Sequence, residues 1–308
     1  MKADEFDSII FDCDGVLIDV TKSYDTTINK TISYVLKEIA NITVDTPLTS
    51  EILLRFKSTG GFNDEIDITY SGILCFIAAE KLNKDPTELI LDVLNKADDS
   101  GIAYIENFLS KIDVDISDVK ARLDYPSTDK NDLIHSTFDQ LFFGPELYSK
   151  IFQKKSKFSE KGFIENDNVI VNSDLIEALK KRFSDKIAIV TGRGFNAISS
   201  SLKEILNQFN VENSVFLEDE SRDLAKPNPQ SLIRSMKGLD SKNCLYVGDS
   251  MEDMILAQKA SELGFQATFC GIYGSGKLPE VKKKMFIEKN TPFILESINF
   301  LPKALNLV

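Results

Sequence analysis

Hydrophobic and polar positions follow two different patterns along this chain. Short, nearly continuous apolar runs, each followed by a stretch with helical periodicity, occur at the beginning and repeatedly after about residue 168. The runs are residues 8–12, 169–171, 187–190, 215–217, 244–247 and 267–270. Apolar strands that alternate with helices are typical of a parallel sheet covered on both faces. The pattern therefore predicts an α/β fold built around a parallel sheet.

The segment between the first run and the others has helical periodicity and few strand signals. Residues 85–101 illustrate it, with Asp85 as the N-cap, Pro86 at the first helical position and Gly101 beyond the end of the helix. A first strand that is separated from its companions by a helical segment predicts a discontinuous core. We expect a core domain of residues 1–19 and 165–308 and an inserted, mainly α-helical domain of residues 20–164.

The composition is that of a folded globular protein. The chain has 308 residues, of which 43% are hydrophobic, enough for one large or two ordinary domains. Its four cysteines are widely spaced and contain no C-x-x-C pair, which predicts buried free thiols and neither a zinc site nor a disulfide framework. The first residues lack the apolar region of a signal peptide, and no window approaches the roughly 20 apolar residues of a membrane span. We expect a soluble cytoplasmic protein.

The charge narrows the range of partners. The net charge is −12 and no basic block occurs, which disfavours nucleic acid and anionic membranes as partners. An acidic surface also repels phosphates. An anionic substrate would therefore need a local cation, either a metal ion or a placed lysine.

Two aspartates end the first predicted strand, in the stretch FDCDGVLID of residues 11–19. Side chains at i and i+2 of a strand point the same way, so Asp12 and Asp14 share a direction if the extended geometry continues through Cys13. Two like charges this close require a cation or a shared proton. Ordinary turn chemistry is one alternative for a D-x-D-G stretch. A calcium-binding loop is excluded, because that alignment places Ile10 at the first ligand position and Thr21 where a bidentate glutamate is required.

Polar residues also follow other predicted strands. In parallel sheets of this kind, ligands bind at the carboxyl ends of the strands. Thr191-Gly192-Arg193-Gly194 follows one strand, and Asp249 and Asp253 follow another within the stretch GDSMED. Lys226, followed by proline, lies between the two. Taken alone, each feature has a plain structural alternative: a turn, a solvated lysine or a helix cap.

The four features in this order strongly resemble the motifs of the haloacid dehalogenase-like superfamily. The resemblance covers residues 6–20 and about 165–275 well. It implies a Rossmann-like core that carries a phosphotransfer site, with a helical cap inserted after the first motif. The long inserted segment is similar to the caps of phosphoglycolate-phosphatase-like proteins.

The resemblance also implies a role for each motif residue. Asp12 would attack phosphorus and form an aspartyl-phosphate, while Asp14 would act as general acid and then as general base. Mg²⁺ would be held by Asp12, the backbone carbonyl of Asp14 and Asp249, with Asp253 as a direct or indirect partner. In the remaining motifs, Thr191 would hydrogen-bond a phosphoryl oxygen, Gly192 and Arg193 would contact the substrate, and Lys226 would neutralise the transferring group. The chain would thus be a Mg²⁺-dependent phosphatase that acts on a small phosphorylated metabolite.

Three other functions are alternatives to this interpretation. A sugar-phosphate mutase of the same superfamily typically has a histidine shortly after the first motif, whereas residues 20–24 read VTKSY. The stretch GIYGSGKL, residues 271–278, matches a nucleotide-binding P-loop except that Leu278 stands where serine or threonine is required. The third is a protein that keeps the fold and binds a phosphorylated ligand without catalysis. The missing histidine argues against the mutase, and Leu278 argues against the P-loop. The filled motif positions Asp12, Asp14, Lys226 and Asp249 count against the non-catalytic protein.

Residues 55–70 are the candidate specificity loop of the helical segment. Gly60 and Gly61 interrupt a helical pattern there and are followed by aromatic and polar residues. Lys57 would offer a charge to the substrate and Asn63 a hydrogen bond. A turn between two helices, with Asn63 as a cap, explains the same residues equally well.

Overall fold

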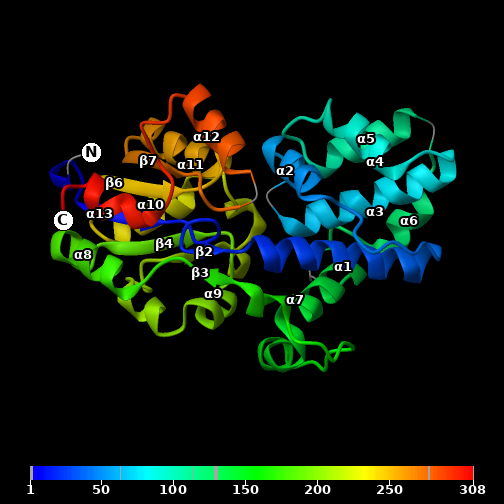
Figure 1. Cartoon of the computed structure of the whole chain (residues 1–308), viewed down its shortest axis with the longest axis horizontal. Helices are drawn as coiled ribbons and strands as arrows, with labels where there is room; N and C mark the ends of the chain where they lie inside the picture. Colours follow the sequence, from blue (N-terminus) through cyan, green and yellow to red (C-terminus); the bar gives the residue numbers. More distant parts are fainter. Residues whose placement is uncertain (1–2, 63, 113, 128–130, 277, 308) are drawn as a thin grey trace. The chain divides into compact units, whose positions relative to one another are not determined.

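The structure is a computed structural model that describes residues 3–62, 64–112, 114–127, 131–276 and 278–307. The chain divides into two compact units (Figure 1). One unit, called the core unit below, comprises Met1–Thr21 and Asn166–Val308. The other, called the helical unit, comprises Lys22–Glu165.

A six-stranded sheet organises the core unit. Its strands are β1 (Ser8–Phe11), β4 (Ile187–Thr191), β5 (Val215–Phe216), β6 (Asn243–Gly248), β7 (Gln266–Ile272) and β8 (Phe293–Leu295). They lie in the order β5-β4-β1-β6-β7-β8, and every neighbouring pair is parallel. The predicted α/β class with a parallel sheet is confirmed. Because β4, β1 and β6 are adjacent, their carboxyl ends meet at the middle of one edge.

Helices cover both faces of this sheet, as Figure 1 shows. Alternate residues of β1 point to opposite faces: Ile9 and Phe11 join one apolar cluster, and Ile10 joins the other. The first cluster is completed by helices α8 (Ser173–Phe183), α9 (Phe195–Leu202) and α13 (Leu301–Ala304). The second is completed by α10 (Gln230–Gly238), α11 (Met251–Glu262) and α12 (Pro279–Glu288). Burial on both faces explains why the strands read as continuous apolar runs.

One expected strand of the parallel sheet pairs elsewhere, so that prediction is wrong for residues 169–171. The short strand β3 (Asn168–Val169) lies antiparallel to β2 (Ile18–Asp19) in a separate two-stranded ribbon. Both edges of β1 are already occupied by β4 and β6, while the chain turns back after β1 and offers β2 as a partner. The strand β8 was not predicted, because its three residues are only partly buried.

The helical unit consists of helices joined by short connections. They are α1 (Thr21–Ala40), α2 (Ser50–Ser58), α3 (Glu65–Leu82), α4 (Pro86–Leu94), α5 (Ile102–Lys111), α6 (Ser117–Leu123) and α7 (Leu133–Phe152). Helix α4 begins as the sequence predicts: the Asp85 side chain accepts a hydrogen bond from the Glu88 N–H, and Pro86 occupies the first helical position. Gly101 lies beyond its end, where it forms the N-cap of α5 with a φ of +62°.

Short 3₁₀ helices fill several connections: Ala3–Glu5, Phe163–Asn166, Lys203–Gln208, Leu217–Asp219, Arg222–Leu224 and Ile298–Phe300. All four cysteines are buried free thiols, as predicted. Among the described residues, no helix is both long enough and apolar enough to cross a lipid bilayer.

Candidate active site

The first motif is a tight turn at the end of β1. Asp12 continues the strand, with its N–H donating to the carbonyl of Val247 at 2.8 Å. The chain then reverses, and the Gly15 N–H donates to the carbonyl of Ile18 at 2.7 Å. Gly15 has a φ of +72°, and a Cβ at this position would lie 1.9 Å from Oδ2 of Asp249. Residue 15 must therefore be glycine for two reasons: its backbone conformation, and the close approach of the Asp249 carboxylate from the end of β6.

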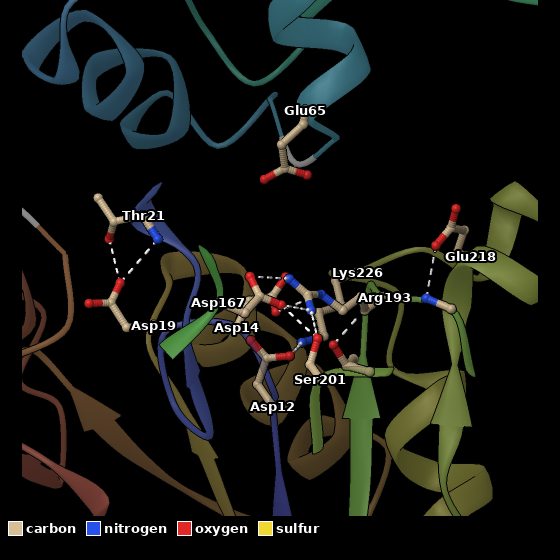
Figure 2. Close-up of polar contacts among 12 residues, drawn as sticks. Asp12, Asp14, Asp19, Thr21, Glu65, Asp167, Arg193, Ser201, Glu218 and Lys226 are labelled. Carbon is tan, nitrogen blue, oxygen red and sulfur yellow. Dashed lines mark hydrogen bonds and ion pairs between the residues drawn. The ribbon is translucent and has the colours of Figure 1, made fainter. Parts of the chain in front are cut away.

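Lys226 joins two carboxylates beneath this turn. Its Nζ lies 2.8 Å from Oδ1 of Asp12 and 2.7 Å from Oδ1 of Asp253. All three side chains are buried, with exposed fractions of 8%, 9% and 0% respectively. Figure 2 shows Asp12 and Lys226 side by side. A buried ammonium between two buried carboxylates compensates charges that would otherwise be costly to remove from water.

Asp253 uses both of its oxygens to hold neighbouring groups. Oδ1 accepts from the Tyr246 hydroxyl at 2.8 Å as well as from Lys226. Oδ2 accepts from the backbone N–H groups of Asp249 and Ser250 at 3.1 and 3.2 Å and from the Ser250 hydroxyl at 2.7 Å. Ser250 in turn caps α11, so the two residues form a capping box. These bonds fix the start of α11 and with it the backbone of Asp249.

Burial and charge shift the acid–base behaviour of this cluster. Burial and the Asp253 carboxylate raise the pKa of Asp12 to about 8, although Lys226 acts in the opposite direction. Burial lowers the pKa of Lys226, but the Asp12 and Asp253 carboxylates outweigh it and raise that pKa well above its ordinary value. Burial also raises the pKa of Asp253, yet Lys226 and the hydrogen bonds bring it below the ordinary value. Lys226 is therefore cationic and Asp253 anionic, and at neutral pH Asp12 holds a proton as long as no further cation balances its charge.

The same carboxylates are suited to a divalent cation. Asp12, Asp249 and Asp253 each offer an oxygen, and these oxygens lie within 4.8 Å of one another. Carboxylate oxygens are the ligands that Mg²⁺ prefers, and the raised pKa of Asp12 reflects a charge that a cation would balance. Asp12 and Asp249 are the better candidates for direct ligands, because both oxygens of Asp253 already accept hydrogen bonds.

The second motif lies at the end of the neighbouring strand β4. Thr191 is 1% exposed, and its hydroxyl accepts a hydrogen bond from the Arg193 N–H at 3.3 Å. A Cβ at Gly192 would meet nothing within 4 Å, so the backbone there is open on that side. The next N–H groups, which begin α9, are already bound: that of Gly194 donates to Glu218 at 2.9 Å, and that of Phe195 donates to Asp219 at 2.7 Å. Figure 2 shows the bond to Glu218.

Arg193, predicted to contact the substrate, lies in a buried network. Its Nη1 is 2.7 Å from Oδ2 of Asp167 and 3.1 Å from the Ser201 hydroxyl, and its Nε is 3.0 Å from Oδ1 of Asp14 (Figure 2). The guanidinium side chain is 0% exposed, whereas Asp14 is 29% exposed. Arg193 thus connects the first motif to residue 167 and holds Asp14 from its buried side.

The two candidates of the helical unit have different outcomes. Lys57, in the last turn of α2, forms an ion pair with Glu65 at 2.9 Å, and the two side chains are 45% and 21% exposed. Asn63 lies outside the described residues. Gly60 and Gly61 lie between α2 and α3, as the interhelical-turn alternative predicts, but the N-cap of α3 is Asp64 rather than Asn63. Contact of Lys57 and Asn63 with a substrate stays a prediction.

Two other features of the sequence, the single histidine and the glycine-rich stretch 271–278, have contacts that stabilise the fold. His135 is buried, and its Nδ1 lies 2.5 Å from Oδ2 of Asp132, the N-cap of α7. The glycine-rich stretch 271–278 joins β7 to α12, and the Ser275 hydroxyl donates to the carbonyl of Gly15. Lys277 of the P-loop-like pattern lies outside the described residues.

Sequence reasoning missed several residues of this site. Asp167 follows no strand, and its partner Arg193 is 26 residues away. Tyr246 is hidden within an apolar run, where only its hydroxyl indicates a polar role. Lys282 was missed because it belongs to a run of three lysines that resembles an exposed helix face. Its Nζ lies 2.6 Å from Oδ2 of Asp249.

Comparison with known proteins confirms the resemblance predicted from the motifs. Residues 160–261 match the family model described as haloacid dehalogenase-like hydrolase. A phosphatase from Thermococcus thioreducens, Tt82, has a similar structure, with a TM-score of 0.59 and 20% identity over 91% of this chain and 98% of that one. A predicted phosphoglycolate phosphatase from Haemophilus somnus 129PT has a TM-score of 0.53 and 16% identity over 97% and 98% of the two chains.

A third solved structure is a putative phosphoglycolate phosphatase from Lactobacillus plantarum, with a TM-score of 0.50 and 13% identity over the whole of both chains. None of the curated proteins compared with the chain matches it. At these identities the solved structures establish the fold of the chain, which is the Rossmann-like α/β fold with a large helical segment.

Proposed function

We propose that this protein is a Mg²⁺-dependent phosphatase that hydrolyses a small phosphomonoester through an aspartyl-phosphate on Asp12. The observation that carries the proposal is the position of Asp12: it directly follows the central strand β1, is paired with the buried Lys226, and has an oxygen within 4.8 Å of one from Asp249. The family match over residues 160–261 and the phosphatase names of similar structures support this reaction class.

The proposed reaction has two displacements. In the first, an oxygen of Asp12 attacks phosphorus and the bond from phosphorus to the leaving oxygen breaks, while Asp14 donates a proton to that oxygen. In the second, Asp14 takes a proton from water, the water oxygen attacks phosphorus, and the Asp12 carboxylate is released. Asp14 is suited to both steps, since it is partly exposed to solvent and is held in place by Arg193 at 3.0 Å.

The other residues would bind the phosphoryl group. Lys226 is cationic and lies 2.8 Å from Asp12, so it would attract the phosphoryl oxygens and stabilise charge in the transition state. Thr191 ends the adjacent strand and would donate a hydrogen bond to the same group. Asp12, Asp249 and the backbone carbonyl of Asp14 would hold Mg²⁺, which would supply positive charge next to the phosphoryl oxygens.

The test is hydrolysis of p-nitrophenyl phosphate and of a panel of small phosphate esters, with Mg²⁺ and with EDTA. We expect Mg²⁺-dependent turnover that Asp12→Asn abolishes. Asp14→Asn should still form the aspartyl-phosphate slowly, with hydrolysis reduced about 10²- to 10⁴-fold, the usual contribution of acid–base assistance. Asp4→Asn, at a 98% exposed side chain, is the matched control.

Three results would contradict the proposal. The first two are full turnover in metal-free buffer and no turnover with any ester of the panel. The third is a crystal structure with the acyl-phosphate mimic BeF₃⁻ in which the adduct lies on a residue other than Asp12. Equal and mild effects of the two active-site substitutions would refute the assigned roles even if the protein is a phosphatase.

A further inference from the structure

Lys282 forms a close ion pair with one of the residues suited to bind metal. Its Nζ lies 2.6 Å from Oδ2 of Asp249, and the two side chains are 14% and 20% exposed. The same Oδ2 is the atom that a Cβ at Gly15 would approach to 1.9 Å. This ammonium therefore lies close to the first motif as well as the fourth, to which Asp249 belongs. None of the motifs predicted from the sequence includes Lys282.

The fold holds Lys282 in this position. Strand β7 runs parallel to β6 and carries the chain to the same edge of the sheet. Beyond β7, the Gly274 N–H donates to the carbonyl of Glu296 at 2.8 Å, and the Ser275 hydroxyl donates to the carbonyl of Gly15. Helix α12 then begins with Pro279 at its first position, which places Lys282 in the first turn. The connection from β7 to α12, which precedes Lys282, is thus hydrogen-bonded to the first motif through Ser275 and Gly15.

A lysine in this place has an electrostatic reason. The N-terminus of a helix carries a partial positive charge, so a cation in the first turn is unfavourable unless an anion compensates it. Asp249 supplies that anion. The next two lysines of α12 point elsewhere: Nζ of Lys283 lies 5.0 Å from the ring centroid of Tyr273, and Nζ of Lys284 lies 3.7 Å from Glu288 on the helix surface. Within the described part of α12, the contact with Asp249 is specific to Lys282.

We infer that Lys282 is a built-in counter-ion of Asp249 that a divalent metal ion must displace in order to bind. The Lys282 ammonium lies 2.6 Å from Oδ2 of Asp249, so a metal ion bound to that oxygen would be its immediate neighbour, and two neighbouring cations repel strongly in a partly buried site. Metal binding then requires Lys282 to leave Asp249. The lysine lowers the affinity for the metal and balances Asp249 when the metal is absent.

This inference rests on the proposed metal site, and the experiment separates the two. Mg²⁺ is titrated into the metal-free protein by isothermal calorimetry, using the wild type, Lys282→Met and the control Lys284→Met. Methionine keeps the length of the side chain and removes its charge. We expect Lys282→Met to bind Mg²⁺ about tenfold more tightly than the wild type, the change that corresponds to about 1.4 kcal/mol. Lys284→Met should bind as the wild type does, and so should Lys282→Arg, which keeps a cation at this position.

A second readout uses the wild-type protein alone and does not depend on the folding of any variant. Amine acetylation followed by mass spectrometry should show that Mg²⁺ increases the labelling of Lys282, which becomes free, and leaves that of Lys284 unchanged. Equal Mg²⁺ affinities of the wild type and Lys282→Met, or labelling of Lys282 that Mg²⁺ does not change, would overturn the inference and leave the phosphatase proposal standing. Failure of every protein to bind Mg²⁺ would overturn the inference together with the proposed metal site.

Discussion

Replacement of Arg193 by methionine tests whether its buried ion pair with Asp167 stabilises the active-site edge of the sheet. The two groups are 2.7 Å apart, and their side chains are 0% and 3% exposed. At that separation and an effective dielectric constant near 20, two unit charges attract by about 6 kcal/mol, against which the cost of burying both charges must be set. Removing one partner leaves the other as an uncompensated buried charge. We expect Arg193→Met to lower the free energy of unfolding by about 3–5 kcal/mol.

The assay is urea unfolding followed by circular dichroism, fitted with separate transitions if the two compact units unfold independently. Arg55→Met is the matched control, because its pair with Glu51 is longer, at 3.4 Å, and exposed, and should contribute less than about 1 kcal/mol. Asp167→Asn removes the other partner. The double variant should lose at least about 1 kcal/mol less than the sum of the two single losses, since no buried charge then remains unpaired.

The stability of Arg193→Met decides between two roles for this residue. A loss within about 1 kcal/mol of that of Arg55→Met would refute the structural role argued from the network. It would favour the prediction made from the sequence, in which Arg193 contacts the substrate. That role requires an increase in KM with little change in kcat, whereas misplacement of Asp14 lowers kcat.

Three further results are expected. Gly15→Ala should destabilise the protein by more than Gly264→Ala does. Both glycines have a positive φ, which costs an alanine about 1–2 kcal/mol, but only at residue 15 would the added Cβ lie 1.9 Å from a carboxylate oxygen. Equal losses of stability in thermal unfolding would contradict this. Burial raises the pKa of Asp132, but its hydrogen bonds to His135 and Ser127 together outweigh this and bring the pKa below 3.8, so the stabilising charge is present at higher pH and is lost as pH falls through that pKa. The difference in stability from Asp132→Asn, which keeps the cap, should shrink below about pH 4, and a difference independent of pH would be inconsistent. Lys57→Ala should lower kcat/KM at least tenfold more for the preferred ester than for p-nitrophenyl phosphate, while the free energy of unfolding falls by less than about 1 kcal/mol. An equal decrease in kcat/KM for both esters would mean that this loop does not contact the substrate.

The central strands were predictable because burial on both faces leaves a strong pattern in the sequence. Residues 8–12, 187–190 and 244–247 are apolar at nearly every position, and each corresponds closely to a strand of the sheet. Adjacency of their carboxyl ends follows from the topology of parallel sheets. That general rule, together with the family resemblance, was enough to single out residues such as Asp12, Thr191 and Asp249 as neighbours.

Residues that reach the site from loops and helices were harder to predict. Lys226 comes from a loop, and its importance followed from the resemblance rather than from any periodic pattern. Asp167 and Lys282 have no such signal, because each acts through a contact with a residue at least 26 positions away. Local sequence patterns report on propensity and burial, whereas such contacts depend on how connections are folded.

The balance of charges at this edge of the sheet links the proposed metal ion to the proposed phosphate substrate. Five carboxylates, Asp12, Asp14, Asp167, Asp249 and Asp253, are paired with three cations, Lys226, Arg193 and Lys282. Each cation bridges or binds carboxylates, and the excess negative charge is expressed in the raised pKa of Asp12. A phosphate ester is itself anionic, so it would be repelled by this excess. In the proposed function, one divalent cation would compensate this deficit of two charges once Asp12 is ionised, so removal of the metal should weaken substrate binding as well as stop the reaction.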